Sequence, residues 1–415
     1  MAPVLASSNA RRVMILAAIV TVFLFVGSSL YKTSNIPIAA GKSSLTGNSG
    51  AGSAEYEKIN AGFSKTPSVS VLSDIESFRT QSSEEFIING ETYHFDFLIP
   101  LTRSHFNFCR SLYTALINDY PKPTLINWGS QLQGAGARVL KINGIDAYLH
   151  ALPDNHFALI MDGFDVWYQL PFKALVDRFV ELLTEVGSQD IAIFGADKKC
   201  WPNDFASPAC TNIPESPLPT DVFGPDTDDA TKITASRRRY IHHRPRWLNS
   251  GNMFGSVKTL RQIYDRANYS ISVAPPDEVY SDQMYIANVY GDQDLPMTVD
   301  FRSQIFQTMT FSHDDIGFVD EDFMSFPRKP ASERKAWAYN KITNFIAPVL
   351  HFNGPKEAMD AWWPKMWWST NVDNKDVREA SEKVFQTGGA YTTDGKFLSW
   401  KDLCGSANVH IPQAI

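Results

Sequence analysis

Short runs rich in apolar residues recur along this chain of 415 residues. They read H-F-D-F-L-I-P-L-T at 94–102, P-T-L-I-N-W at 123–128, F-A-L-I-M at 157–161 and D-I-A-I-F-G-A at 190–196. Runs of this kind, without strict polar and apolar alternation, are typical of strands covered on both faces. They predict four strands of a buried sheet.

Segments with helical spacing of apolar residues separate these runs. The spacing predicts helices at 106–120, 136–150 and 171–187, the last ending at Gly187. Strands that alternate with helices form βαβ units, whose strands run parallel. The predicted fold class is therefore α/β, with a mixed, mainly parallel, Rossmann-like sheet flanked by helices. In such sheets, ligands bind beyond the carboxyl ends of the strands.

An uncharged apolar stretch at residues 13–31 follows Arg11 and Arg12. At a helical rise of about 1.5 Å per residue, it nearly crosses a hydrocarbon core of about 30 Å. Arginines before the stretch favour a cytoplasmic N-terminus, and so a single-pass type II membrane protein. A cleaved signal peptide is the alternative, because V-G-S before Ser29 resembles a cleavage site.

The residues after this stretch are rich in Ser, Gly, Thr, Ala and Lys and lack periodicity, so we expect a flexible stem. The predicted organisation is a cytoplasmic tail at 1–12, a transmembrane signal anchor at 13–31, a stem at 32–88 and a catalytic domain at 89–415. Either interpretation of the N-terminus sends most of the chain into the secretory pathway. The predicted location is the Golgi or endoplasmic reticulum membrane, with the catalytic domain in the lumen.

Entry into that pathway affects two other features. N-Y-S at Asn268 becomes a glycan acceptor, and disulfides become possible. Four cysteines are too few for a disulfide scaffold and are not spaced as a zinc site; the short interval favours a bond between Cys200 and Cys210.

Charge limits the choice of partners. The formal net charge of −7 argues against a nucleic-acid partner. The basic cluster S-R-R-R-Y-I-H-H-R-P-R at 236–246 follows an acidic, proline-rich loop at 202–232. It is either a solvated face that balances this acidic loop or a surface that binds an anionic substrate.

Two carboxylates follow the apolar run at 157–161. Asp162 and Asp165 lie in a turn that Gly163 makes possible, so both can face the open end of the strand. Mg²⁺ and Mn²⁺ commonly take one or two carboxylates together with substrate phosphates. The pair is therefore a candidate metal site, although acids after a strand also cap a helix or face solvent.

A second motif, H-F-N-G-P-K, spans residues 351–356 after another apolar run. His351 is a candidate metal ligand. The amides of the following loop and Lys356 are candidates for binding phosphate. An ordinary turn that happens to contain a histidine is the alternative.

Three further motifs end or begin predicted elements. L-N-S-G, containing Asn249, ends a short strand, and Asp282 opens a helical pattern after Ser281. G-A-D-K-K-C-W-P places Asp197 and Trp201 at a strand end. Asp282 is either functional or an N-terminal helix charge, and Trp201 is either a platform for a sugar ring or a core residue.

Taken in order, these motifs resemble the glycosyltransferase domain of procollagen lysyl hydroxylases and their collagen galactosyltransferase relatives. The matching segments are I-M-D-G-F-D-V, F-G-A-D-K-K-C-W-P, L-N-S-G-N-M-F-G, S-D-Q-M-Y, V-D-F-R-S-Q-I-F-Q and H-F-N-G-P, between residues 94 and 356. The resemblance implies a GT-A fold and a UDP-sugar bound through Mn²⁺ or Mg²⁺. The resemblance covers the glycosyltransferase domain alone, so we expect a stand-alone transferase and not a lysyl hydroxylase.

The resemblance also implies roles for individual residues. The metal ligands are expected to be Asp162, Asp165 and His351. The diphosphate contacts are expected to be Asn353, Gly354 and Lys356. The residues expected to line the sugar and acceptor side are Trp201, Asn249 and Asp282. Apart from the resemblance, we expect the uracil and ribose near Thr102 and Trp128, and either Asp282 or Asp197 as the acid that orients or deprotonates the acceptor. One departure is Ser281, since the family usually has a further acid there; another is Asp197, where the family often has Glu.

The expected activity is transfer of galactose or glucose from a UDP-sugar to a hydroxyl of a protein or glycan. Two alternatives stay open: a catalytically silent relative that binds a glycan or protein, and a transferase that uses a GDP-sugar. Retention of all three expected metal ligands argues against the silent relative.

Overall fold

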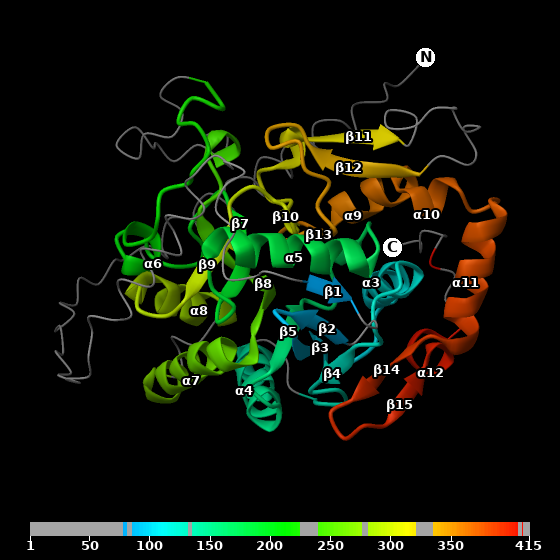
Figure 1. Cartoon of the computed structure of the whole chain (residues 1–415), viewed down its shortest axis with the longest axis horizontal. Helices are drawn as coiled ribbons and strands as arrows, with labels where there is room; N and C mark the ends of the chain where they lie inside the picture. Colours follow the sequence, from blue (N-terminus) through cyan, green and yellow to red (C-terminus); the bar gives the residue numbers. More distant parts are fainter. Residues whose placement is uncertain are drawn as a thin grey trace, which may run out of the picture. The chain divides into compact units, whose positions relative to one another are not determined.

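Figure 1 shows a computed structural model of the chain, in which residues 78–80, 85–131, 135–224, 240–275, 281–320, 335–405 and 409 are described. The chain divides between Asn48 and Ser49 into two units, and all described residues belong to the second. The predicted anchor at 13–31 lies outside them. Within the described ranges, no helix has the length and apolar character needed to cross a bilayer.

A sheet of ten strands organises the described residues. Along its main path the strands are β15 (Phe397–Ser399), β14 (Gly389–Thr392), β4 (Thr124–Ile126), β3 (Glu91–Pro100), β5 (His156–Met161), β8 (Trp247–Ser256), β7 (Ala192–Asp197) and β9 (Met297–Asp300). Strands β14, β4, β3, β5, β7 and β9 point the same way, while β15 and β8 oppose them. The prediction of a mixed, mainly parallel sheet is confirmed.

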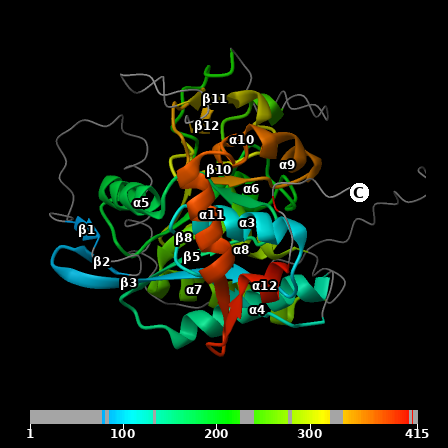
Figure 2. The same ribbon diagram turned by 90° about the vertical axis from the view of Figure 1, so that its right-hand side faces the viewer.

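Helices cover both faces of this sheet. The longer ones are α3 (Phe106–Ile117), α4 (Ala135–Ala151), α5 (Phe172–Val186), α7 (Val257–Val273), α8 (Asp282–Asp292) and α11 (Lys375–Thr387). Figures 1 and 2 show α4 and α7 on one face and α3 and α5 on the other. The core between α5 and the sheet is aromatic: the rings of Phe179 and Phe254 stack 3.6 Å apart, with Phe157 packed edge-on against both. Helix α5 ends where Gly187 adopts φ 73°, as the sequence predicted.

The remaining helical elements are short. They are α6 (Pro208–Thr211), α9 (Glu357–Trp362), α10 (Trp367–Thr370) and α12 (Trp400–Cys404), with 3₁₀ turns η2 (Tyr240–His242), η3 (His313–Asp315) and η6 (Trp363–Lys365). A two-stranded sheet joins β11 (Ile316–Asp320) to β12 (Ala336–Asn340).

A small three-stranded sheet carries part of the candidate site. Its order is β10 (Phe306–Thr308), β13 (Val349–His351) and β6 (Val166–Tyr168). In its register, His351 lies opposite Val166 on one side and Thr308 on the other. Since β6 begins directly after Asp165, this pairing brings His351 beside the acid pair although almost 200 residues separate them in sequence.

The L-N-S-G segment does not end a short strand, as predicted, but lies near the start of β8, which continues to Ser256. The strand is antiparallel to both neighbours. Against β7, Asn249 pairs with Gly195 and Met253 pairs with Phe194, so residues 250–252 form a bulge. A glycine and two polar residues let the strand bend here, close to Asp162 and His351.

Two disulfides use all four cysteines. The predicted bond between Cys200 and Cys210 is confirmed. A second bond joins Cys109 of α3 to Cys404 of α12, across 295 residues of sequence. We did not predict the second pair, because nothing in the spacing of these two cysteines signals that they meet.

Ordered structure begins before residue 89. Strands β1 (Phe78–Thr80) and β2 (Glu85–Ile88) fall inside the range assigned to the flexible stem, and they form an antiparallel extension of β3. In β2, Phe86 and Ile88 are buried, so E-F-I-I has the alternation of a half-buried strand. The compositional bias of the preceding residues hid this signal.

Candidate metal and sugar-nucleotide site

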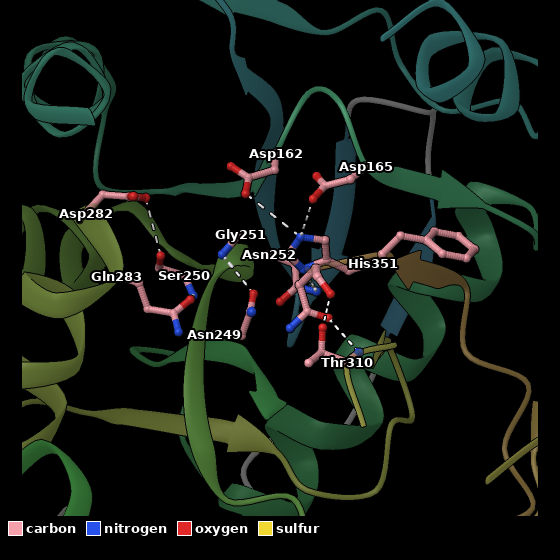
Figure 3. A network of polar contacts seen from close by, with 12 residues as sticks. Asp162, Asp165, Asn249, Ser250, Gly251, Asn252, Asp282, Gln283, Thr310 and His351 are labelled. Atoms are coloured by element: carbon pink, nitrogen blue, oxygen red, sulfur yellow. Dashed lines mark hydrogen bonds and ion pairs between the residues drawn. The ribbon is translucent and has the colours of Figure 1, made fainter. Parts of the chain in front are cut away.

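Three side chains from distant parts of the sequence meet at the carboxyl end of β5. The Nε2 atom of His351 lies 3.4 Å from Oδ2 of Asp165 and 3.9 Å from Oδ2 of Asp162. One ligand atom from each residue fits within a cluster less than 4.8 Å across. Figure 3 shows both carboxylates turned toward the imidazole. The structure therefore brings together the three residues predicted as metal ligands.

The backbone fixes these three residues from several sides. The amide of Asp162 donates to the carbonyl of Gly251 over 2.8 Å, and the amide of Phe352 donates to the carbonyl of Asp165 over 2.7 Å. A Cβ atom on Gly163 would lie 2.9 Å from Leu101 at the end of β3. Glycine at 163 therefore lets the acid-bearing turn pack closely on the neighbouring strand.

The cluster has the chemistry of a divalent-cation site. His351 is 2% exposed, yet its Nε2 forms no hydrogen bond within the described part of the chain. A buried polar atom in this condition is costly unless it meets another partner. Two carboxylate oxygens and one imidazole nitrogen suit Mn²⁺ or Mg²⁺, with places left for phosphate or water. The residues thus fit the metal that the sequence predicted.

Two lysines surround the acids. Lys356 binds Asp165, and its Nζ also donates to the carbonyl of Phe352 over 2.9 Å. Burial tends to raise the pKa of Asp165, but its interactions with His351 and Lys356 outweigh burial and hold that pKa below its usual range. Asp165 therefore stays ionised, as a metal ligand must.

The second lysine, Lys141 of α4, was missed by the sequence analysis. Its Nζ lies 2.7 Å from Oδ1 of Asp162 and 2.6 Å from Oδ2 of Asp282. Burial acts to lower the pKa of Lys141, yet the two carboxylates raise it above its usual value, so Lys141 stays charged. A lysine in a helix carries no local signal of function in the sequence. The contact of Lys141 with the acids becomes visible only once α4 is placed against them.

Asp282 and Gln283, at the start of α8, connect the Lys141 side chain to the sheet. Oδ2 of Asp282 accepts from the hydroxyl of Ser250 at 3.4 Å, and Oε1 of Gln283 accepts from the amide of Ser250 at 3.2 Å. The Nε2 of Gln283 donates to the carbonyl of Trp201 over 2.6 Å. The S-D-Q motif therefore links the β8 bulge to the loop that carries Trp201.

Asp197 lies in a separate polar cluster behind the metal ligands. It accepts from Nδ2 of Asn249 at 3.1 Å and from Nδ2 of Asn353 at 2.8 Å. Burial raises the pKa of Asp197 to about 6, against the opposing effect of these two hydrogen bonds. The structure thus gathers three predicted site residues into one network, in which Asp197 is the titratable member.

This network borders a cavity of about 260 Å³. The residues lining it are Asp197, Lys198, Lys199, Trp201, Asn249, Gln283, Thr310, Phe311, Asn353 and Gly354. Trp201 is 55% exposed, which excludes the alternative that it is a core residue. Gly354 has φ 102° and faces the Thr310 hydroxyl at a distance that leaves no room for a side chain. A cavity with one exposed aromatic and several convergent polar groups suits a sugar ring.

The predicted nucleotide residues lie in the loops that follow β3 and β4. The carbonyl of Thr102 accepts from the amide of Gly129, next to Trp128, over 2.8 Å. No hydrogen bond of the described residues ties Thr102 or Trp128 to the acids. Phe164, between the two acids, was not predicted; it is 37% exposed, and its ring meets that of His105 edge-on at 5.4 Å.

Two peripheral predictions also have a place in the structure. Asn268 lies in α7, where its Nδ2 donates to Asp146 over 2.7 Å, and its glycosylation stays a prediction. Within the basic cluster, residues 236–239 lie outside the described ranges. Arg244 and Arg246 both pair with Glu215 of the acidic loop, but their side chains are only 9% and 14% exposed, so this part of the cluster is not a solvated face.

No family model matches the chain. In sequence, it is 22% identical over 231 residues to a multifunctional procollagen lysine hydroxylase and glycosyltransferase of Caenorhabditis elegans. The match covers 54% of this chain and 25% of that protein, so the chain spans about a quarter of the relative's length. The chain therefore has distant sequence similarity to a protein with a glycosyltransferase activity in its name.

Two solved structures of glycosyltransferases are also similar. One is involved in glycosylation of the major capsid of PBCV-1, with a TM-score of 0.37, 10% identity, and coverage of 64% of this chain and 95% of that one. The other is an active-site mutant of LgtC, with a TM-score of 0.32, 10% identity, and coverage of 69% and 94%.

Proposed function

We propose that this protein is a metal-dependent glycosyltransferase that moves a hexose, galactose or glucose, from a UDP-sugar to a hydroxyl group of a protein or glycan. The observation that carries the proposal is the meeting of Asp162, Asp165 and His351 at the end of β5, with two lysines beside the acids. A GT-A arrangement of the sheet belongs to the same proposal. The distant similarity to a hydroxylase and glycosyltransferase supports it.

A divalent cation held by these three residues would neutralise charge on the diphosphate of the donor. Lys356 and Lys141 would supply further positive charge to the phosphates as the nucleoside diphosphate leaves. Asn353 and Gly354 would shape the loop next to the phosphates, and the hydrogen bonds that Asn353 accepts from the amides of Met309 and Thr310 hold that loop.

The base and ribose of the nucleotide would bind in front of the loops after β3 and β4, near Thr102 and Trp128. Phe164, which lies between the two acids in sequence, offers an exposed ring that packs against His105 in the loop after β3. Aromatic planes stack with bases of any sequence, so such a ring suits the uracil.

Asp197 is the better candidate for the acid that orients or deprotonates the acceptor. Asp282 is bound to Lys141, and although burial opposes the effect, this lysine lowers the pKa of Asp282 and weakens it as a base. Asp197 borders the cavity and has a pKa raised to about 6 by burial, closer to neutral pH. A base works best when its pKa lies near the working pH.

We further propose a secretory location, as a type II protein of the Golgi or endoplasmic reticulum membrane with a lumenal catalytic domain. Two disulfides support an oxidising compartment, and the apolar stretch at 13–31 supports an anchor. The acceptor hydroxyl would then belong to a secreted or membrane glycoprotein or glycan.

The test is donor turnover by the full chain. Release of nucleoside diphosphate is measured with UDP- and GDP-sugars, in Mn²⁺ and in EDTA. We expect hydrolysis of a UDP-hexose that depends on Mn²⁺. Turnover of GDP-mannose alone would instead indicate a GDP-sugar transferase, and no turnover with any donor would indicate a silent binding protein.

A matched pair of variants tests the metal site. Asp165→Ala should lower Mn²⁺-dependent turnover by about 100-fold or more, since a metal ligand supplies several kcal/mol of transition-state stabilisation. Asp177→Ala, which removes an exposed carboxylate paired with Lys173 on α5, should leave turnover unchanged. Full turnover by Asp165→Ala would exclude the proposed metal site.

A further inference from the structure

The fully buried amide of Asn252 contacts the imidazole of His351. Asn252 is 0% exposed, and its amide group lies 3.3 Å from Nδ1 of His351, on the side of the ring opposite to the acids. Figure 3 shows the two side chains close together, with Asn252 in the β8 bulge. Nothing in the sequence analysis singled out Asn252.

The β8 bulge puts Asn252 in this position. The residue still pairs with Met161 of β5 but has no partner in β7. Its Oδ1 lies 2.1 Å from the point where Gly195 would carry a Cβ atom, so the amide lies directly over a glycine of β7. Bulge and glycine together make room for a buried polar side chain beside the histidine.

The chemistry of a metal-bound imidazole decides the direction of this hydrogen bond. If Nε2 gives its lone pair to a cation, Nδ1 carries the proton and needs an acceptor. In the structure the atom of Asn252 that lies 3.3 Å from Nδ1 is its Nδ2, while its Oδ1 forms no hydrogen bond within the described residues. Rotating the amide by a half-turn exchanges its oxygen and nitrogen with almost no change in volume.

We infer that Asn252 is a positioning residue for the metal centre: its Oδ1 accepts the Nδ1–H of His351 and so holds Nε2 toward the cation beside Asp162 and Asp165. The inference rests on the proposed function, because it assumes that the three ligands bind a divalent cation. Hydrogen bonds of this kind to the outer nitrogen of a metal-bound histidine fix the ring and increase its basicity.

The first test is the affinity for Mn²⁺ alone, from the EPR signal of free Mn²⁺ titrated with the metal-free full chain. Asn252→Leu keeps the side-chain size but removes the acceptor, and it should weaken Mn²⁺ binding by about 10- to 100-fold. Asn252→Asp keeps an acceptor of the same shape and should bind Mn²⁺ at least as tightly as the wild type. The control Asn340→Leu removes another buried amide, which donates to Gln307 at 2.9 Å, and should leave the affinity unchanged.

Two further measurements keep the test decisive if Asn252→Leu does not fold. Gly195→Ala displaces the amide without removing it and should also weaken Mn²⁺ binding. In the Zn²⁺-loaded wild type, ¹⁵N–¹H spectra should show a slowly exchanging Nδ1–H on His351, assigned by its loss in His351→Ala. A rapidly exchanging Nδ1–H, or unchanged Mn²⁺ affinity in Asn252→Leu, would overturn the inference.

The outcome for His351→Ala separates this inference from the proposed function. If His351→Ala loses Mn²⁺ while Asn252→Leu binds it normally, Asn252 has no role but the metal site stands. If the wild type binds no Mn²⁺, or if His351→Ala binds it as well as the wild type, the proposed metal-dependent function itself fails.

Discussion

Gly251 lies so close to His351 that a Cβ atom on it would stand 2.3 Å from Cε1 of the imidazole. The same atom would lie 2.6 Å from Oδ2 of Asp162. Gly251→Ala should therefore push apart two of the three ligands. Displacements of about 1 Å in a catalytic site commonly cost about 100-fold in rate, and we expect a loss of this size in Mn²⁺-dependent turnover.

The matched control for Gly251→Ala is Gly317→Ala in β11. There the three atoms nearest to the added one all belong to Tyr339, the closest at 2.6 Å. Both variants should lose stability through overpacking, by about 1 to 3 kcal/mol, but Gly317→Ala should keep full turnover at temperatures where it is folded. Equal turnover in the two variants would mean that the space at residue 251 is not needed by the metal ligands.

Lys141→Met should destabilise the metal-free protein, because Asp162 and Asp282 would lose their shared cation. Because Asp162 is 34% exposed, solvent screens the pair, and the loss in unfolding free energy should be smaller than for a fully buried pair, about 1 to 3 kcal/mol. Mn²⁺ should restore part of the lost stability, because it brings positive charge to Asp162 and binds only the folded state. Urea unfolding with and without Mn²⁺ measures both effects.

The control for Lys141→Met is Lys258→Met, which removes an exposed partner of Asp190. Surface ion pairs contribute about 0 to 1 kcal/mol, so its unfolding free energy should change little and should not respond further to Mn²⁺. Equal stability of the two variants would contradict the bridging role of Lys141.

Asp197 makes stability depend on pH. In the folded protein its pKa is raised to about 6, from a usual value of 3.8, so between these two values the folded state binds more protons than the unfolded state. The free energy of unfolding therefore falls as pH rises through this window, by about 3 kcal/mol from this residue. Asp197→Asn lacks the titration. We expect the difference in unfolding free energy between wild type and variant to change by about 2 kcal/mol between pH 4 and 6.5, which is most of the full effect. A constant difference would contradict the raised pKa.

Trp201 and Phe205 provide a matched pair on one loop. Both are about half exposed, at 55% and 53%, but only Trp201 is among the residues lining the cavity. Trp201→Ala should raise the KM of donor or acceptor about tenfold, equivalent to about 1.4 kcal/mol, with little change in melting temperature. Phe205→Ala should change neither value. Similar KM values in both variants would indicate that the cavity beside Trp201 does not bind the donor or the acceptor.

The sequence predicted the elements whose signal is local. Strands β3, β4, β5 and β7 and helices α3, α4 and α5 fall within a few residues of their predicted ranges, because each is a short apolar run or a helical pattern. The meeting of Asp162, Asp165 and His351 was also predicted, from motifs at strand ends and from the family resemblance. The sequence did not show that β13, which ends in His351, belongs to the small three-stranded sheet and not to the main one.

What the sequence did not show depends on packing between distant segments. The approach of Lys141 to Asp162 follows from the placement of α4, and the contact of Asn252 with His351 depends on a bulge in β8. Neither residue differs locally from an ordinary surface lysine or strand asparagine. The pairing of Cys109 with Cys404 likewise could not be predicted from local sequence, because it depends on where α12 packs against α3.

The placement of β14 has a consequence for biosynthesis. This strand lies in parallel beside β4, with Tyr391 opposite Thr124, and so completes one side of the sheet with residues made more than 260 positions later. A ribosome therefore releases most of the domain while β4 still has an open edge, which is prone to pair with other chains.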